Sequence, residues 1–140
     1  MEMRQPYRIQ HRYAGLRLRD EVIWDAFILA NPSAFVSVAY DVHVGEPCTD
    51  AKERARMTAT GAYEVSQWCV DVLAWDGKRE YVIEVKPNAG AGALGQALAY
   101  RELLVLEGRV SPQAVPAVLT DIISPITKQA AQLLGVLLLI

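Results

Sequence analysis

The sequence predicts an α/β fold, with a mixed central sheet flanked by helices. Three observations support this prediction. Apolar runs with the two-residue period of strands alternate with runs of helical period, in the order helix, three strands, helix, strand, helix, strand. An Asp-Gly pair separates two of the apolar runs, which is typical of a hairpin. The chain of 140 residues is 52% hydrophobic, enough for one buried core, so we expect a single domain over residues 1–140.

The first helix is expected over residues 15–30, where Asn-Pro follows the last helical position. Its apolar stripe comprises Leu16, Ile23, Phe27 and Ala30. A strand is expected next, over residues 34–44, with a single apolar face. That face comprises Val36, Val38, Tyr40, Val42 and Val44. Residues 45–66 stay open between a loop, a short helix and an insertion.

Two further strands are expected over residues 67–75 and 79–86, on either side of Asp76-Gly77. Residues 91–107 predict a helix that ends at Gly108, and residues 115–120 predict a strand. In the last helix, over residues 124–135, Ser124 is expected to cap the first turn and Pro125 to occupy the first helical position. Residues 136–140 complete the sheet.

Basic side chains gather in two segments, although the formal net charge is −2. Residues 1–14 form a basic N-terminal arm, and the arginines of residues 1–19 are Arg4, Arg8, Arg12, Arg17 and Arg19. The second group is Lys52, Arg54 and Arg56. Taken alone, both groups indicate a solvated surface. Beside a site that handles phosphate, they would bind nucleic acid.

The composition also indicates where the protein acts. No apolar run reaches membrane-spanning length, and the N-terminus is charged and lacks an apolar signal core, so we expect neither a membrane partner nor secretion. The cysteines, Cys48 and Cys69, have no metal-binding spacing and are expected to be unremarkable thiols. His11 and His43 also lack the spacing of metal ligands and are expected to be structural. We therefore expect a cytoplasmic protein, or one of the host cytoplasm if a phage encodes it.

The hairpin brings three charged side chains onto one face of the sheet. If Asp76 and Gly77 are the two loop residues, Asp71 lies opposite Val82, and Asp71, Glu84 and Lys86 share a face. Charges in strands this apolar are costly unless they are paired or bound to metal. Two carboxylates suit Mg²⁺, and a lysine can orient or deprotonate water, or stabilise a phosphoryl transition state. The structural alternative is a buried Asp71 bonded to backbone and an exposed Glu84–Lys86 pair.

These residues resemble the core signature of the PD-(D/E)XK nuclease superfamily, which has the restriction-endonuclease-like fold. The resemblance rests on Asp71 followed, after a hairpin, by Glu84-Val85-Lys86. The segment from Gln96 to Tyr100 resembles the Q-x-x-x-Y element of RecB-like members. The residue before Asp71 is valine, where the family often has proline.

The resemblance implies a Mg²⁺-dependent deoxyribonuclease, in which Mn²⁺ can substitute. The implied catalytic residues are Asp71, Glu84, Lys86 and an acid of the first helix, for which Glu21 is the best candidate and Asp20 and Asp25 are rivals. The implied metal ligands are Asp71, Glu84, Glu21 and the backbone carbonyl of Val85. The resemblance places Gln96 and Tyr100 beside DNA or the catalytic lysine, and the basic residues listed above along the DNA.

Within the superfamily, a small catalytic domain with a basic N-terminal segment resembles the archaeal-type Holliday-junction resolvases. That resemblance implies a homodimer that cuts branched DNA during recombination or repair, because a four-way junction presents two equivalent phosphates. Gln96 and Tyr100 favour the alternative of a RecB-like exonuclease or single-strand nuclease. A catalytically silent DNA-binding protein with the same fold is the other alternative.

Overall fold

The computed structural model describes residues 4–45, 51–60 and 68–140. The strands are β1 (Gln5–Pro6), β2 (Ser37–Val44), β3 (Trp68–Trp75), β4 (Glu80–Val85), β5 (Val115–Leu119) and β6 (Leu137–Leu139). The helices are α1 (Leu18–Ala30), α2 (Ala51–Thr60), α4 (Ala91–Leu106) and α5 (Pro125–Leu134). Each of the predicted helices and strands is present, and β1 is additional. Helix α2 lies in the segment where a short helix was one of the open alternatives.

The six strands form one mixed sheet, in which they lie side by side in the order of the sequence. Neighbours from β1 to β4 run antiparallel, whereas β4–β5 and β5–β6 are parallel pairs. The two parallel connections pass through α4 and α5, as parallel strands require. The predicted α/β architecture with a mixed central sheet is therefore confirmed.

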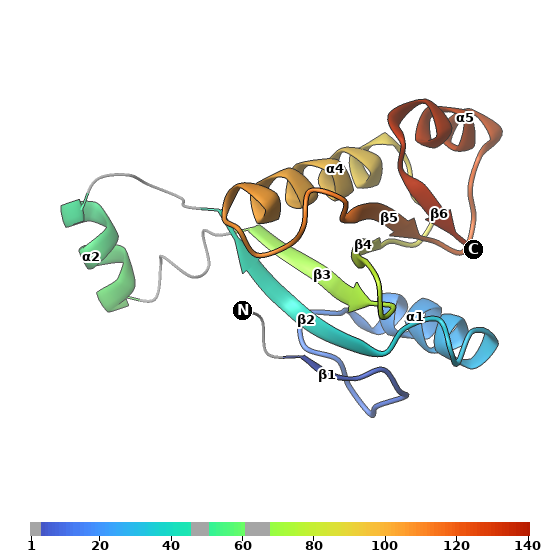
Figure 1. Ribbon diagram of the computed structural model, residues 1–140, viewed down its shortest axis with the longest axis horizontal. Helices are drawn as coiled ribbons and strands as arrows, with labels where there is room; N and C mark the ends of the chain where they lie inside the picture. Colours follow the sequence, from blue (N-terminus) through green and yellow to red (C-terminus); the bar gives the residue numbers. More distant parts are fainter. Residues whose placement is uncertain (1–3, 46–50, 61–67) are drawn as a thin grey trace.

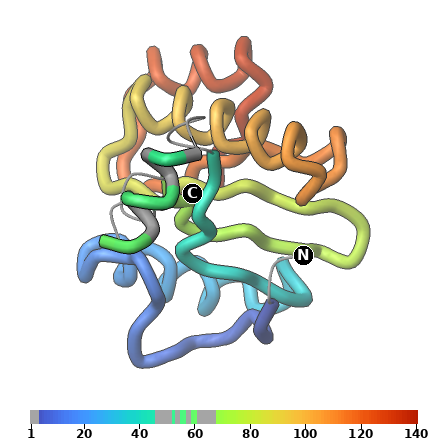
Figure 2. The backbone as a smooth tube through the Cα atoms, turned by 90° about the vertical axis from the view of Figure 1, so that its left-hand side faces the viewer, coloured from blue at the N-terminus to red at the C-terminus, as the bar shows by residue number. Residues whose placement is uncertain are grey.

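Helices cover both faces of the sheet, which gives three layers (Figure 1). One face packs against α1, in a core built around Trp24 and Ile83. The other face packs against α4 and α5 and forms two cores. One core includes Leu73 and Leu104, and the second includes Leu94 and Ala131. In Figure 2, α4 and α5 lie above the strands and α1 lies below them.

The buried side of α1 differs from the predicted stripe. The helix begins at Leu18, so Leu16 is buried ahead of it, while Ala30 is exposed at its end. The side that faces the sheet is centred on Trp24, whose indole N–H donates to the hydroxyl of Tyr40 at 2.9 Å. The largest apolar side chain, which can bury the most surface, sets the rotation of the helix. This rotation decides which acids of α1 face the carboxyl end of β4.

The N-terminal segment does not form the free basic arm that the sequence predicts. Strand β1 pairs with β2, and Tyr7 and Tyr13 are both buried in the core on the α1 side. The guanidinium of Arg4 lies over the ring of Trp75, 5.5 Å from its centroid, in a cation–π contact. The apolar area of the two tyrosines holds this segment against the sheet.

Strand β2 does not keep a single apolar face. Val38 packs on the α1 side, whereas Val42 and Val44 pack on the α4 side. The change occurs at Asp41, whose φ of 53° lies in the left-handed region and breaks the alternation of side chains. Residue 36 precedes the strand and is exposed, so the predicted five-residue face is wrong at both ends.

The β3–β4 hairpin has a four-residue turn, Asp76–Arg79, in place of the predicted two-residue loop. Trp75 pairs with Glu80 and Leu73 pairs with Val82. The side chain of Asp76 closes the turn by accepting from the backbone N–H groups of residues 78 and 79, at 2.7 and 2.8 Å. The partner of every β3 residue is thereby shifted by two positions, which leaves the predicted faces unchanged.

The C-terminal elements agree with the predictions. The hydroxyl of Ser124 caps α5 by accepting from the N–H of Thr127, and Pro125 occupies the first helical position. Gly135 ends the helix with a left-handed φ of 72°. Within the described ranges, the structure contains no helix of the length and apolarity that a membrane crossing needs.

Candidate functional site

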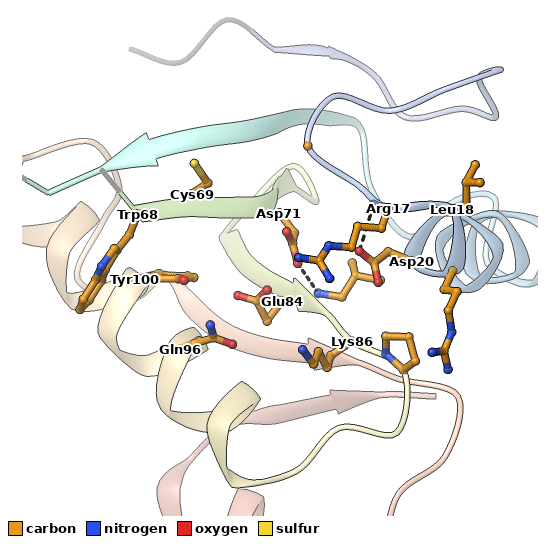
Figure 3. A pocket seen from close by; sticks show the side chains of 14 residues that line it. Arg17, Leu18, Asp20, Trp68, Cys69, Asp71, Glu84, Lys86, Gln96 and Tyr100 are labelled. Carbon is orange, nitrogen blue, oxygen red and sulfur yellow. Dashed lines mark hydrogen bonds between the residues drawn. The ribbon is translucent and has the colours of Figure 1, made fainter. Parts of the chain in front are cut away.

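A pocket of about 680 Å³ opens where the ends of β3, β4, α1 and α4 meet (Figure 3). Its acidic and polar side chains come from segments far apart in the sequence. They are Asp20 of α1, Cys69 and Asp71 of β3, Glu84 of β4, Lys86 after it, and Gln96 and Tyr100 of α4. Arg17 and Arg19 line the same pocket beside the start of α1. The polar lining gathers most of the residues predicted to act in catalysis.

Two carboxyl groups meet at the centre of the pocket. Val72 pairs with Ile83, so one further step along the hairpin brings Asp71 opposite Glu84. Figure 3 shows the two side chains directed toward each other. Oδ2 of Asp71 accepts from the backbone N–H of Val85 at 2.9 Å, which fixes the Asp71 carboxyl at the end of β4. Glu84 is 8% exposed, and its Oε2 is buried without a hydrogen-bond partner.

Burial and mutual contact shift the pKa values of this pair. Burial, followed by the hydrogen bond to Asp71 and the charge of Asp71, raises the pKa of Glu84 to about 10, against an opposing effect of the Lys86 ammonium. Burial also raises the pKa of Asp71, although hydrogen bonds from Glu84 and the Val85 N–H oppose the change. Both shifts have the same direction, so in the metal-free protein burial and mutual repulsion favour a protonated form of the pair.

The structure brings Asp20, and not Glu21, to the pocket. Asp20 lines it, and its charge raises the pKa of both Asp71 and Glu84. The carboxylate of Glu21 is buried elsewhere and accepts from Nε of Arg12 at 2.9 Å. Asp25 accepts from the hydroxyl of Tyr13 at 2.5 Å. The rotation of α1 turns Asp20 toward the pocket and Glu21 away from it. Glu21, which was expected to act in catalysis and metal binding, is therefore replaced in the pocket by Asp20.

The predicted Gln96–Tyr100 pair lies on the α4 side of the pocket. The two residues are one helical turn apart, and the nearby Gln96 amide opposes the rise in the pKa of Tyr100. Burial, and then the charges of Glu84 and Asp71, raise the pKa of Tyr100. The ring of Tyr100 packs on Trp68, with centroids 5.9 Å apart. Gln96 is exposed, so its amide borders both the acidic pair and solvent.

The predicted basic residues divide into three groups. Arg17 and Arg19 line the pocket and are exposed. Arg4 contacts Trp75, and Arg12 forms an ion pair with Glu21. These two arginines and the exposed Arg8 do not line the pocket. Lys52 and Arg56 are exposed on α2, and the side chain of Arg54 lies outside the described part of the chain.

Trp68 and Cys69 also line the pocket. Trp68 was not among the predicted site residues, and Cys69 was expected to be an unremarkable thiol. Cys69 precedes Asp71 by two residues, and this spacing was the available signal, since it places both at the same end of β3. Cys48 lies outside the described residues, and His11 is exposed.

The carboxyl groups of the pocket fit a hard divalent cation. Asp71, Glu84 and Asp20 offer oxygen atoms, which Mg²⁺ prefers. A cation held by these carboxyl groups would neutralise their charge and satisfy Oε2 of Glu84, which is buried without a hydrogen-bond partner. The backbone of Val85 also lines the pocket.

No protein-family model matches the chain, and no curated protein matches it. One solved structure, described as the crystal structure of the protein of unknown function AF1548, has a similar fold, with a TM-score of 0.56 and 19% sequence identity. The similarity covers 87% of this chain and 57% of that chain, so the present chain spans little more than half the length of AF1548. At this identity, the similarity concerns the fold alone.

Proposed function

We propose that this protein is a metal-dependent deoxyribonuclease of the PD-(D/E)XK type, with a restriction-endonuclease-like core. The observation that carries the proposal is the buried Asp71–Glu84 pair, in which Oε2 of Glu84 lacks a hydrogen-bond partner. Two carboxyl groups that share one proton are a costly arrangement in a folded protein. A divalent cation offsets this cost, and phosphodiester hydrolysis is a reaction that bound divalent cations catalyse.

The proposed cation is Mg²⁺, with Mn²⁺ able to substitute, held by Asp71, Glu84, Asp20 and the backbone carbonyl of Val85. When bound, it would supply a Lewis acid and lower the pKa of coordinated water. Val85 N–H orients the Asp71 carboxylate, and Lys86 projects its ammonium beside Glu84, where it would stabilise negative charge on the scissile phosphate. Catalysis by this group of residues requires the proton on Glu84 to leave.

The proposed DNA path crosses the pocket between α1 and α4. Arg17 and Arg19 supply positive charge on the α1 side, and Gln96 supplies an exposed amide on the α4 side. Arginine binds phosphate through a planar set of donors, and an amide can donate to a phosphate oxygen. The acidic pair lies between these two sets of donors, where a backbone phosphate would reach both.

We propose structure-specific cleavage of branched DNA by a homodimer, as in Holliday-junction resolvases, as the first form of this activity. The position of Gln96 and Tyr100 in the pocket lining favours a second form, a RecB-like exonuclease or single-strand nuclease, because the Q-x-x-x-Y element is typical of that group. A catalytically silent DNA-binding protein would have no need of Asp71, Glu84 and Lys86 together in one pocket.

The experiment is the cleavage of end-labelled DNA in the presence of Mg²⁺ or Mn²⁺, with a four-way junction, a linear duplex and a single strand as substrates. Paired nicks confined to the junction support a resolvase and its dimer. Progressive shortening from an end supports the RecB-like activity instead. If none of the substrates is cut while binding persists, the nuclease proposal fails and the silent DNA-binding protein takes its place.

A further inference from the structure

A second group of possible metal ligands lies beside the acidic pocket, on β2 and β3. Asp41 and His43 come from β2, and Cys69 comes from β3, directly opposite His43 in the ladder. One ligand atom from each of the three side chains lies within 4.8 Å of the others. All three residues are partly buried, so neighbouring groups restrict their side chains while solvent can still reach them.

We propose that Asp41, His43 and Cys69 bind a thiophilic divalent cation of the Zn²⁺ class, in a site separate from the proposed Mg²⁺ site. The ligand types support this class, because imidazole and thiolate select zinc-like ions, whereas Mg²⁺ requires oxygen. In a tetrahedral zinc site, neighbouring N, O and S ligand atoms lie about 3.3–3.6 Å apart. Nε2 of His43 and Oδ2 of Asp41 are already 3.5 Å apart.

The backbone positions the carboxylate of this site at a conformational cost. Asp41 has a φ of 53°, a left-handed value that is uncommon outside glycine and that aspartate adopts more readily than most other residues. Gly15 packs directly against it, since a Cβ on Gly15 would lie 2.7 Å from Oδ1 of Asp41. The close approach of Gly15 and the unusual φ together direct the Asp41 side chain toward His43 and Cys69.

The site differs from the acidic pocket in chemistry, although Cys69 lines both. Figure 3 shows the Cys69 thiol on the side of β2, away from Glu84. The three ligands leave a fourth tetrahedral position for water or another molecule. On binding, the thiol proton passes to solvent and the thiolate bonds to the cation. The cation thereby links β2 to β3 next to the pocket, whatever reaction the pocket performs.

The test is a titration of the metal-free full-length chain with Co²⁺, a spectroscopic substitute for Zn²⁺. We expect a near-ultraviolet sulfur-to-cobalt charge-transfer band that saturates at one Co²⁺ per chain and disappears when Zn²⁺ is added. Cys69→Ser should abolish the band, and His43→Ala should weaken Co²⁺ affinity by at least about tenfold, since even indirect support of a metal ligand has an effect of that size.

Two control variants separate this site from its surroundings. Cys48→Ser removes the other cysteine of the chain and should leave the band intact. The double variant Asp71→Asn/Glu84→Gln should also retain it, because the acidic pair contributes no sulfur. Absence of the band in the unaltered chain overturns the proposal, as does its survival in Cys69→Ser or its loss in Cys48→Ser. None of these readouts depends on DNA cleavage, so the nuclease proposal can fail independently.

Discussion

The carboxyl group of Glu84 lies against that of Asp71 across two neighbouring strands, and this contact, together with burial, raises the pKa of Glu84 to about 10. The two residues are brought together by the β3–β4 hairpin, and the N–H of Val85 holds the Asp71 carboxyl in place. This relationship determines what the pocket can bind and how the fold responds to pH.

Loss of either carboxyl group is expected to remove cleavage without removing DNA binding. Asp71→Ala or Glu84→Ala should lower the cleavage rate by at least about a hundredfold, since even residues that support a metal ligand have effects approaching that size. Gel-shift and cleavage assays on the same DNA separate the two properties. Glu102→Gln, which alters an exposed acid of α4 outside the pocket, serves as the control. Cleavage at normal rates by either alanine variant would remove the proposed metal site.

The stability of the metal-free protein is expected to fall as the pH rises above the usual pKa of a glutamate. Between that value and about 10, the unfolded chain has released the Glu84 proton while the folded chain retains it. Each pH unit in this range then lowers the free energy of unfolding by at most about 1.4 kcal/mol through this group. Chemical denaturation at pH 5 to 9 measures the slope.

Comparison with Glu84→Gln isolates this contribution from the other titrating groups. The variant carries no proton to lose at this position, so its stability should depend less on pH and exceed that of the unaltered chain at pH 8. Mg²⁺ should reduce the slope of the unaltered chain only. Equal slopes in the two proteins would contradict the raised pKa of Glu84.

Two adjacent acids of α1 are expected to behave differently. Asp20→Asn should slow cleavage, because Asp20 lines the pocket. It should leave stability nearly unchanged, because the amide oxygen can still accept from the backbone N–H of Arg17, which donates to Oδ2 of Asp20 at 3.1 Å. Glu21→Gln should leave cleavage intact and lower stability by about 1–3 kcal/mol, because the buried Glu21 loses its ion pair with Arg12. Cleavage rates and urea unfolding of the two variants give the comparison. The reverse pattern would restore Glu21 as the catalytic acid.

The arginines at the start of α1 are expected to bind phosphate. Arg17→Ala/Arg19→Ala should weaken duplex binding and reduce the slope of log affinity against log salt concentration by up to about 1.8, or 0.9 for each lost phosphate contact. Arg79→Ala, in the exposed hairpin turn, provides a control with one charge removed at the opposite end of β3. An unchanged slope in the double variant would assign both arginines to an ordinary solvated surface.

Two glycine substitutions are expected to have opposite effects on stability. Gly15→Ala should destabilise the fold by about 1–3 kcal/mol, because its φ is 77° and the new Cβ would meet Asp41. Gly95→Ala in α4 meets no atom within 4 Å and should stabilise the protein by about 0.5–1 kcal/mol, since glycine is unfavourable inside a helix. Urea unfolding measures both. A neutral Gly15→Ala would mean that Asp41 is not held by its neighbour.

The shared face of Asp71 and Glu84 could be predicted from the sequence even though the turn was wrong. Moving from a two-residue to a four-residue turn shifts the strand pairing by two positions, and the side-chain period of a strand is also two. In the observed register, Asp71 and Glu84 lie directly opposite each other, whereas the predicted register made them diagonal neighbours. The additional turn residues are ordered by the side chain of Asp76, whose hydrogen bonds are not visible in a dipeptide pattern.

Other features depend on packing that a periodic pattern does not contain. The acid that faces the pocket depends on the rotation of α1, which Trp24 sets by its contacts with the sheet and with Tyr40. The break in β2 depends on a single left-handed residue, Asp41, which no run of apolar residues reveals. The N-terminal segment shows charges in its sequence, but its position is decided by two buried tyrosines.

The location of the acidic pair within the hairpin has a consequence for the kinetics of folding. If the hairpin grows stepwise from its turn, the pair Trp75–Glu80 forms early and Asp71 meets Glu84 late, near the far end of the hairpin. Repulsion between ionised carboxylates would then act late on the folding pathway, after most of the ladder exists. At alkaline pH, the open end of the hairpin should therefore exchange its amide hydrogens faster than the turn end, and a bound cation should slow that exchange.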